Sequence, residues 1–158
     1  MREIGLKNIN IKKLNMKKII LILIILFGLW NLIWFVTVTI KYQKFIDAVP
    51  KNKYGVYNKE ESGYVFNVKT PDYLRFTGNL GVSKVESLDG LIIWPLLFGG
   101  YEYGVRLQKG DQIFEIYVDE NMNPIYKDDE VAVEQIKKNQ EEVQAMISKA
   151  NEMWDLKK

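Results

Sequence analysis

The chain has 158 residues, with 22 Lys plus Arg, 20 Asp plus Glu, no Cys and no His. These counts exclude a disulfide framework, a catalytic thiol, a Ser-His-Asp triad and the usual ligand sets of zinc and haem, so no cofactor is expected. The charge is unevenly distributed. Residues 1–40 carry six basic side chains and one acidic one, whereas residues 41–158 carry 16 basic and 19 acidic ones, for a total of +2.

A run of 22 residues, 19–40, contains no charged side chain, and 16 of its residues are Ile, Leu, Phe or Val. At about 1.5 Å per residue, a helix of this length covers ~33 Å, enough for a hydrocarbon layer of about 30 Å. The run is longer than a secretory h-region and has no small-x-small cleavage site at its exit. It predicts an uncleaved transmembrane signal anchor that contacts the lipid bilayer through residues 19–40.

The basic residues around the span set its orientation only weakly, because six precede it and five Lys fall within the next 20 residues. We favour a cytoplasmic N-terminal segment, residues 1–18, and an extracytoplasmic remainder, since a short basic head before an apolar run resembles a signal sequence. The order Met16-Lys17-Lys18 makes Met16 an alternative start. The 19 Lys against three Arg suggest an AT-rich genome and a Gram-positive bacterium.

Asn31 is the one strongly polar residue of the span, and Gly28 lies one turn before it. An amide and a small residue on a transmembrane helix favour packing against a partner helix. The alternative is that so apolar a span tolerates one Asn. Trp30 and Trp34 lie deeper than a typical interfacial belt, so their position indicates no anchoring role.

Residues 41–53 are predicted to form a juxtamembrane helix of two turns, as far as Val49, followed by a hinge that begins at Pro50. Residues 54–158 are long enough for one hydrophobic core and form the predicted extracytoplasmic α+β domain. They lack the basic stripe that nucleic-acid binding requires, so no nucleic acid is expected as a partner.

From Tyr54 onwards the hydrophobic pattern has the period of two that is typical of strands. Connections are short and carry hairpin signals such as Asp89-Gly90, which predicts antiparallel neighbours in a meander. The predicted extended segments are 63–70, 73–77, a weaker strand at 82–88, 101–108 and 112–118.

An apolar stripe of helical period runs from residue 129 to residue 156, after acids suited to capping a helix. One helix of this length would be ~42 Å long, against a diameter of roughly 35 Å for a compact domain of this size. It therefore overhangs the domain or breaks within residues 137–142. The predicted fold is α+β: a single N-terminal transmembrane helix, then an antiparallel β-meander sheet packed against a long C-terminal amphipathic helix.

Residues 91–98 form the most unusual stretch outside the span, because eight apolar residues in succession do not alternate between core and solvent. Pro95 also lacks a ladder donor, which argues against a central strand. One interpretation is an exposed apolar loop that enters the membrane or a partner's pocket; the other is a core segment beneath the C-terminal helix. The neighbouring tyrosines suit a binding face or simply a strand. The hypothetical partner-binding residues are Trp94, Pro95, Leu97, Phe98, Tyr101 and Tyr103.

Two candidate chemistries have simpler alternatives. The segment from Asp119 to Glu130 resembles a calcium-binding loop, but Pro124 stands where such a loop needs Gly, so a turn leading into a helix cap is favoured. Glu102 and Glu115 lie on adjacent predicted strands, where acids of a solvent-facing sheet usually pair with basic neighbours. No catalytic or metal-binding residue is predicted.

These observations predict a non-enzymatic, single-pass, membrane-anchored interaction module that binds or inhibits another envelope or secreted protein, as an immunity protein does. Tethering to the membrane raises its effective concentration there. Two alternatives stay open: an accessory membrane subunit of a secretion or conjugation machine, and a sensor domain for a small ligand or lipid.

Overall fold

The computed structural model describes residues 16–156, and its first element is a single long helix, α1 (Met16–Ala48). The helix has 33 residues and contains an 18-residue stretch of high hydropathy, so it is long and apolar enough to cross a membrane. No residue of that stretch is buried in the rest of the protein. The predicted span, residues 19–40, falls entirely inside this helix. Most of the predicted N-terminal segment lies outside the described residues.

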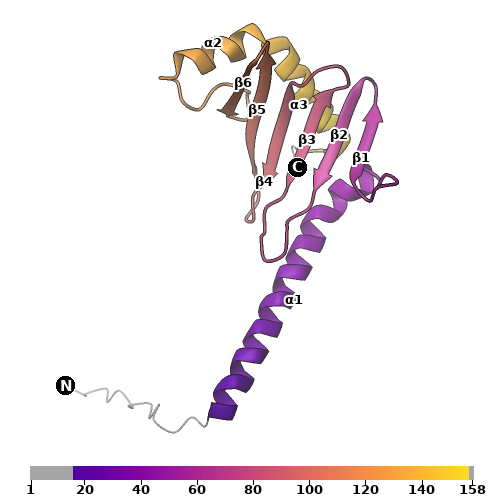
Figure 1. Cartoon of the computed structure of the whole chain (residues 1–158), viewed down its shortest axis with the longest axis vertical. Coiled ribbons are helices and arrows are strands. Elements are labelled where there is room, and N and C mark those ends of the chain that lie inside the picture. The colour runs from indigo at the N-terminus through magenta and orange to yellow at the C-terminus, as the bar shows by residue number, and fades with distance from the viewer. Residues whose placement is uncertain (1–15, 157–158) are drawn as a thin grey trace, which may run out of the picture.

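The last two turns of α1 belong to the globular domain (Figure 1). Tyr42, Phe45 and Val49 are almost completely buried in its hydrophobic core. The chain after the helix is held in place as well: Asn58 N–H donates to the Pro50 carbonyl at 3.3 Å, and Lys51 forms an isolated bridge with Tyr57. The segment predicted as a hinge therefore lies within the domain, and α1 runs from the apolar span into the core without interruption.

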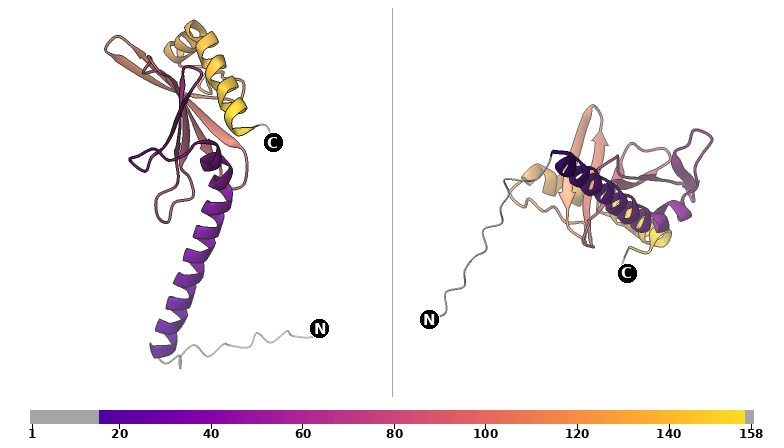
Figure 2. Two further views of the ribbon diagram at one scale, coloured as in Figure 1. Left: turned by 90° about the vertical axis from the view of Figure 1, so that its right-hand side faces the viewer. Right: turned by 90° about the horizontal axis from the view of Figure 1, so that it is seen from below.

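Six antiparallel strands follow in a simple meander, so that each strand pairs with the next in the chain. The predicted α+β architecture is confirmed, with the sheet and the C-terminal helices in two layers (Figures 1 and 2). The strands are β1 (Tyr57–Glu61), β2 (Tyr64–Lys69), β3 (Asn79–Lys84), β4 (Gly90–Pro95), β5 (Tyr101–Lys109) and β6 (Gln112–Val118).

The strands with clear alternation match their predictions: β2, β5 and β6 fall within two residues of the predicted bounds. The weaker strand lies earlier than predicted, because Asn79 already pairs with Lys69 and the register ends where Lys84 meets Tyr64. Residues 73–77 are a loop rather than a strand.

The expectation that Pro95 argues against a central strand is wrong. β4 lies between β3 and β5, and its burial alternates along the chain despite the uniformly apolar sequence. Pro95 is tolerated because it is the last residue of the strand: it pairs with Tyr101 of β5, whereas pairing with β3 has already ended at Ile93. No ladder bond to β3 is lost at this position.

The C-terminal helical segment breaks within the predicted interval, giving α2 (Glu130–Lys138) and α3 (Gln140–Trp154). Asp129 caps α2 by accepting a hydrogen bond from the Ala132 N–H at 2.9 Å. At the break, the Asn139 side chain donates to the Gln135 carbonyl at 2.8 Å, and the Asn139 backbone N–H donates to the same carbonyl at 3.1 Å. α3 lies across β3 and β4.

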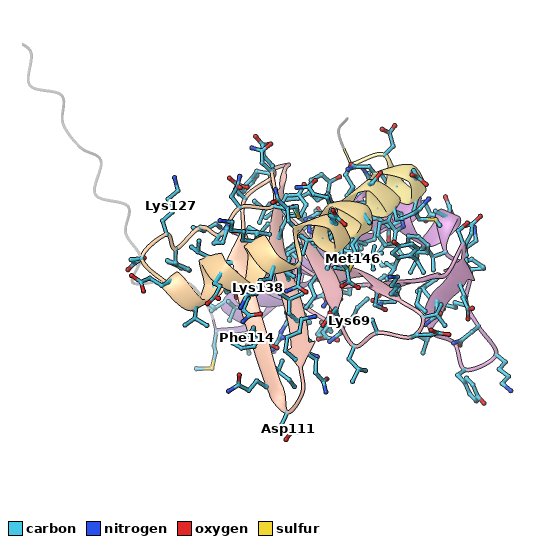
Figure 3. All side chains as sticks on the ribbon, turned by 90° about the horizontal axis from the view of Figure 1, so that it is seen from above. Lys69, Asp111, Phe114, Lys127, Lys138 and Met146 are labelled. Atoms are coloured by element: carbon cyan, nitrogen blue, oxygen red, sulfur yellow. The ribbon has the colours of Figure 1, made fainter. Side chains whose placement is uncertain are left out.

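The helices cover one face of the sheet only, as the side view in Figure 2 shows. On this covered face, apolar side chains from five strands meet α3 and the end of α1. Phe66 of β2 packs edge-on against Trp154 of α3, with ring centroids 5.7 Å apart. Seen from above, Asp111 marks the tip of the β5–β6 hairpin on the side away from α3 (Figure 3).

Candidate functional site

The uncovered face of the sheet carries an aromatic pair on two strands that flank β5. Trp94 of β4 and Tyr117 of β6 stack across β5, with ring centroids 5.8 Å apart and planes 30° from parallel. Gly104 of β5 lies between them, and a Cβ there would come within 2.8 Å of Trp94 Cη2. The absence of a side chain at this position therefore lets the indole ring lie flat over the sheet.

Around this aromatic pair the surface is mixed. Ile92 lines a shallow groove of about 90 Å³ beside this pair, together with the polar side chains Arg106 and Glu115. Arg106 Nη2 lies 2.6 Å from Glu115 Oε1, and both side chains are at least half exposed. Such an exposed ion pair contributes little to folding, but it adds polar groups at the rim of an apolar centre, as protein interfaces have.

The six residues predicted to bind a partner do not form one surface. Trp94 lies on the uncovered face, while Pro95 is buried. Tyr101 and Tyr103 point to the covered face and pack against the core. Leu97 and Phe98 lie in the β4–β5 loop. The apolar run thus divides into a core strand with one uncovered side chain pair, Ile92 and Trp94, and an exposed loop.

The β4–β5 loop, residues 96–100, is a tight turn with its apolar tip in solvent. Leu96 N–H donates to the Gly100 carbonyl at 3.0 Å, and Gly99 and Gly100 both have positive φ, which makes glycine the favoured residue there. Phe98 is 98% exposed. A pocket of about 490 Å³ separates this loop from α1 between Val36 and Phe45.

Two lysines of α1 connect the helix to the same edge of the sheet. Lys41 Nζ donates to the Pro95 carbonyl at 2.7 Å, and Lys44 Nζ donates to the Tyr101 hydroxyl at 3.1 Å. Burial lowers the pKa of Lys41 below the usual lysine value. These two hydrogen bonds hold α1 in one rotational orientation about its axis relative to β4 and β5.

A second, wider cleft of about 900 Å³ lies on the covered side, between the β5–β6 edge and α3. Its walls include Tyr101, Tyr103, Glu120 and Asn151. Burial, together with the neighbouring Tyr101 and Glu120, raises the pKa of the Tyr103 phenol above the usual tyrosine value. The cleft combines aromatic rings with acids.

The predicted transmembrane packing residues have different surroundings. No side chain or backbone atom lies within 4 Å of a Cβ placed on Gly28, so this position is open to a neighbour. Asn31 is already engaged: its Nδ2 donates to the Phe27 carbonyl at 2.7 Å, and its Oδ1 accepts from the Tyr73 hydroxyl. One donor and the acceptor oxygen of its amide are therefore already engaged within the chain.

The two candidate chemistries take simple forms. Asp119 Oδ1 accepts hydrogen bonds from the backbone N–H groups of Asn121 and Asn123, at 2.9 and 2.8 Å, and so closes its own turn. Glu115 faces Arg106 across the strands, whereas Glu102 faces Trp94. The two glutamates therefore belong to different cross-strand pairs. Among residues 16–156, no three acidic groups gather as a metal site would require.

Tyr117 and Gly104 were missed as site residues. The alternation of β6 predicts that Tyr117 points to the other face from its inward-facing neighbour Ile116. Trp94 lies in a run without alternation, so its position beside Gly104 and Tyr117 follows only from the pairing of β4 with β5 and of β5 with β6. No protein-family model matches this chain, and no characterised protein or solved structure is significantly similar to it. Its function is therefore inferred from geometry and chemistry.

Proposed function

We propose that this protein is a non-enzymatic, single-pass, membrane-anchored interaction module whose domain faces the outside of the cytoplasmic membrane. In this role it binds or inhibits another envelope or secreted protein. The main observation behind this proposal is the stacked pair Trp94 and Tyr117 on a sheet face that, within residues 16–156, has no helix over it. Aromatic side chains at the centre of a polar rim are typical of the residues that dominate protein interfaces.

Anchoring by α1 supports this role, because a helix that spans the membrane confines the uncovered face to a thin layer above it. Binding rather than catalysis is supported by the arrangement of the acids: Glu115 pairs with Arg106, and Glu102 lies opposite Trp94 instead of Glu115.

The test combines topology with site-specific crosslinking. Gly5→Cys and Asp111→Cys, made singly in this Cys-free chain, are labelled from outside intact cells with a membrane-impermeant maleimide. We expect labelling at position 111 only. Labelling at position 5 only would place the domain in the cytoplasm and contradict the proposal.

A photoreactive phenylalanine analogue is then placed at Tyr117, with Tyr54 as the matched control, since both tyrosines are exposed. We expect one dominant crosslinked envelope or secreted protein at position 117, none at position 54, and loss of the product when Trp94→Ala is added. Equal crosslinking at the two positions, or a product that survives Trp94→Ala, would argue against the uncovered face as the binding surface.

A second candidate, a small-ligand sensor, is favoured by the cleft between the β5–β6 edge and α3. Its tyrosines and the acid Glu120 suit a cationic ligand, because aromatic faces and carboxylates both attract cations. Titration of the full chain with choline, spermidine and arginine, followed by calorimetry, tests it. Binding that is lost in Tyr103→Ala would favour the sensor, and no heat with any of the three would argue against it.

A further inference from the structure

Two loops connect strands at the end of the sheet that lies nearest to α1 (Figure 1). In an antiparallel meander the β2–β3 and β4–β5 connections lie at one end of the strands, and the other three turns lie at the opposite end. We call the first two, residues 70–78 and 96–100, the proximal loops. They are the parts of the domain that lie along the apolar helix.

The first proximal loop contacts α1 far below the end of the predicted span. Trp34 Nε1 donates to the Arg75 carbonyl at 2.6 Å, and the Trp34 and Tyr73 rings meet edge-on at 5.3 Å. The Phe76 ring meets the Trp30 ring edge-on at 5.7 Å. Since Trp34 and Trp30 precede residue 40 by six and ten residues, these contacts lie about 9 and 15 Å below the end of the span.

The loop is also fixed at its base. Gly78 N–H donates to the buried Tyr42 hydroxyl at 2.6 Å. A Cβ on Gly78 would lie 2.0 Å from the Lys69 carbonyl oxygen, so only glycine allows this close return of the chain. The loop is therefore held against α1 from Tyr42 down to Trp30 rather than extending freely into solvent.

This geometry conflicts with a hydrocarbon layer that reaches residue 40. Irregular backbone exposed to lipid tails leaves polar groups unsatisfied and does not occur in the hydrocarbon region. Residues 73–77 form such an irregular segment, and Leu74 within it is 40% exposed. The outer boundary of the hydrocarbon must therefore lie close to the tip of the loop, at the level of Trp30 to Trp34.

The length of α1 allows this lower boundary. The uncharged stretch from Ile19 to Trp34 has 16 residues and is about 24 Å long, and a membrane accommodates a stretch somewhat shorter than its ~30 Å hydrocarbon core by thinning locally or by snorkelling of flanking lysines such as Lys18. Trp30, Trp34 and Tyr73 then lie at the outer interface, where Trp and Tyr are enriched because their rings are apolar and their N–H or O–H groups are polar.

We propose that the domain is seated in the outer interfacial layer of the membrane that α1 spans. The first proximal loop lies at the hydrocarbon boundary, at Trp30–Trp34, and the second, which lies beside Val36 to Phe45, contacts the headgroup layer just above it. This rests on the proposed membrane anchoring and adds a second attachment to it. Phe98, at the tip of the second loop, and Leu74, in the first, are the apolar side chains offered to lipid. The partner is the bilayer because these side chains continue the apolar surface of α1.

This position in the membrane gives roles to Trp30, Trp34 and Asn31, which the sequence alone does not explain. Trp30 and Trp34 anchor the helix at the interface together with the first proximal loop. There, Asn31 Oδ1 accepts a hydrogen bond from the Tyr73 hydroxyl, which holds the loop against the helix. Attachment at α1 and at two loops holds the sheet at a fixed height and azimuth above the lipid.

The experiment measures depth in the bilayer with the full chain. The natural chain has no Cys, so single spin labels are introduced by Leu23→Cys, Leu74→Cys, Phe98→Cys and Leu88→Cys. Leu88 is the matched control, because it is apolar and 71% exposed but lies at the opposite edge of the sheet. Each variant is reconstituted in nanodiscs of phosphatidylcholine and phosphatidylglycerol, and its accessibility to oxygen and to a water-soluble nickel chelate is recorded.

We expect an oxygen-to-nickel ratio at positions 74 and 98 several-fold above that at position 88, and highest at position 23. Water-like ratios at 74 and 98 with a deep label at 23 would overturn the seating and leave the anchor intact. Exclusion of both reagents at 74 and 98 would indicate a protein cover and would also overturn it. A water-like label at 23 would contradict the anchoring itself. Because Leu74 has positive φ, Arg75→Cys serves as a second probe of that loop.

Discussion

The two faces of the sheet differ sharply, although the same strands supply both. On the covered face Leu91 and Ile93 of β4 are fully buried beneath the helices, whereas their neighbours Ile92 and Trp94 on the other face are only partly buried. Burial of apolar side chains is the main favourable term in folding. The covered face therefore carries most of the stability, and the apolar groups of the uncovered face are free to serve binding.

The largest expected effect comes from removing the end of α1. A chain that starts at residue 54 lacks Tyr42, Phe45 and Val49, and losing three buried side chains at roughly 2–5 kcal/mol each is comparable with the whole stability of a typical domain. We expect this chain to be unfolded and a chain starting at Lys41 to be folded. Dispersion of amide signals in proton–nitrogen NMR spectra distinguishes them. A folded chain from residue 54 would show that the helix end is dispensable.

A single substitution of the same core should have a smaller but large effect. Phe45→Ala empties a fully buried position against Tyr42, whose ring centroid is 5.8 Å away, and should lower the free energy of unfolding by about 3–5 kcal/mol. Urea unfolding of the full chain in detergent, followed by near-ultraviolet circular dichroism, measures this. Phe98→Ala, at an exposed loop tip, is the control and should leave the midpoint unchanged.

The comparison of the two faces is sharpest at adjacent residues of β4. Ile93→Ala removes a fully buried side chain and should cost about 2–5 kcal/mol. Trp94→Ala removes a ring that stacks on Tyr117 without a helix above it, and should cost only about 1–2 kcal/mol. The same urea experiment compares them. A Trp94 effect as large as that of Ile93 would mean that the uncovered face is part of the structural core.

The smallest structural change, the loss of one hydroxyl, should have an effect similar in size to that of Trp94→Ala. Tyr42→Phe removes the acceptor of the Gly78 N–H and leaves that buried donor unpaired, which should cost about 1–3 kcal/mol. It should also increase hydrogen exchange at the Gly78 amide, while Tyr54→Phe, an exposed tyrosine, changes neither quantity. Unchanged exchange in Tyr42→Phe would indicate that the first proximal loop is held without this bond.

Elements fixed by local pattern could be predicted from the sequence, and those fixed by distant contacts could not. The span, the β5–β6 hairpin and the capped C-terminal helices each carry a periodicity or a turn signal of their own. β1 has the polar sequence YNKEE, and its pairing with β2 makes it a strand. Residues 73–77 alternate like a strand but form a loop, because Tyr73 contacts Asn31, 42 residues earlier in the chain.

The candidate site was predictable only in part for the same reason. Trp94 stood out because it is a large aromatic residue in an unusual run. Tyr101 and Tyr103 were grouped with it by proximity in sequence, but the register sets Trp94 opposite Glu102, which turns both tyrosines to the other face. A shift of one residue in register exchanges the two faces, so the composition of a surface depends on pairing that no single segment encodes.

The continuity of α1 makes the anchor and the domain one mechanical body. Tyr42, Phe45 and Val49 are buried directly after the apolar stretch, so no flexible segment separates that stretch from the core. With the proposed anchoring, a change in tilt or rotation of the helix within the bilayer is transmitted to the sheet as a rigid rotation. Conversely, a force applied by a bound partner reaches the membrane through the helix backbone, with torque as well as tension.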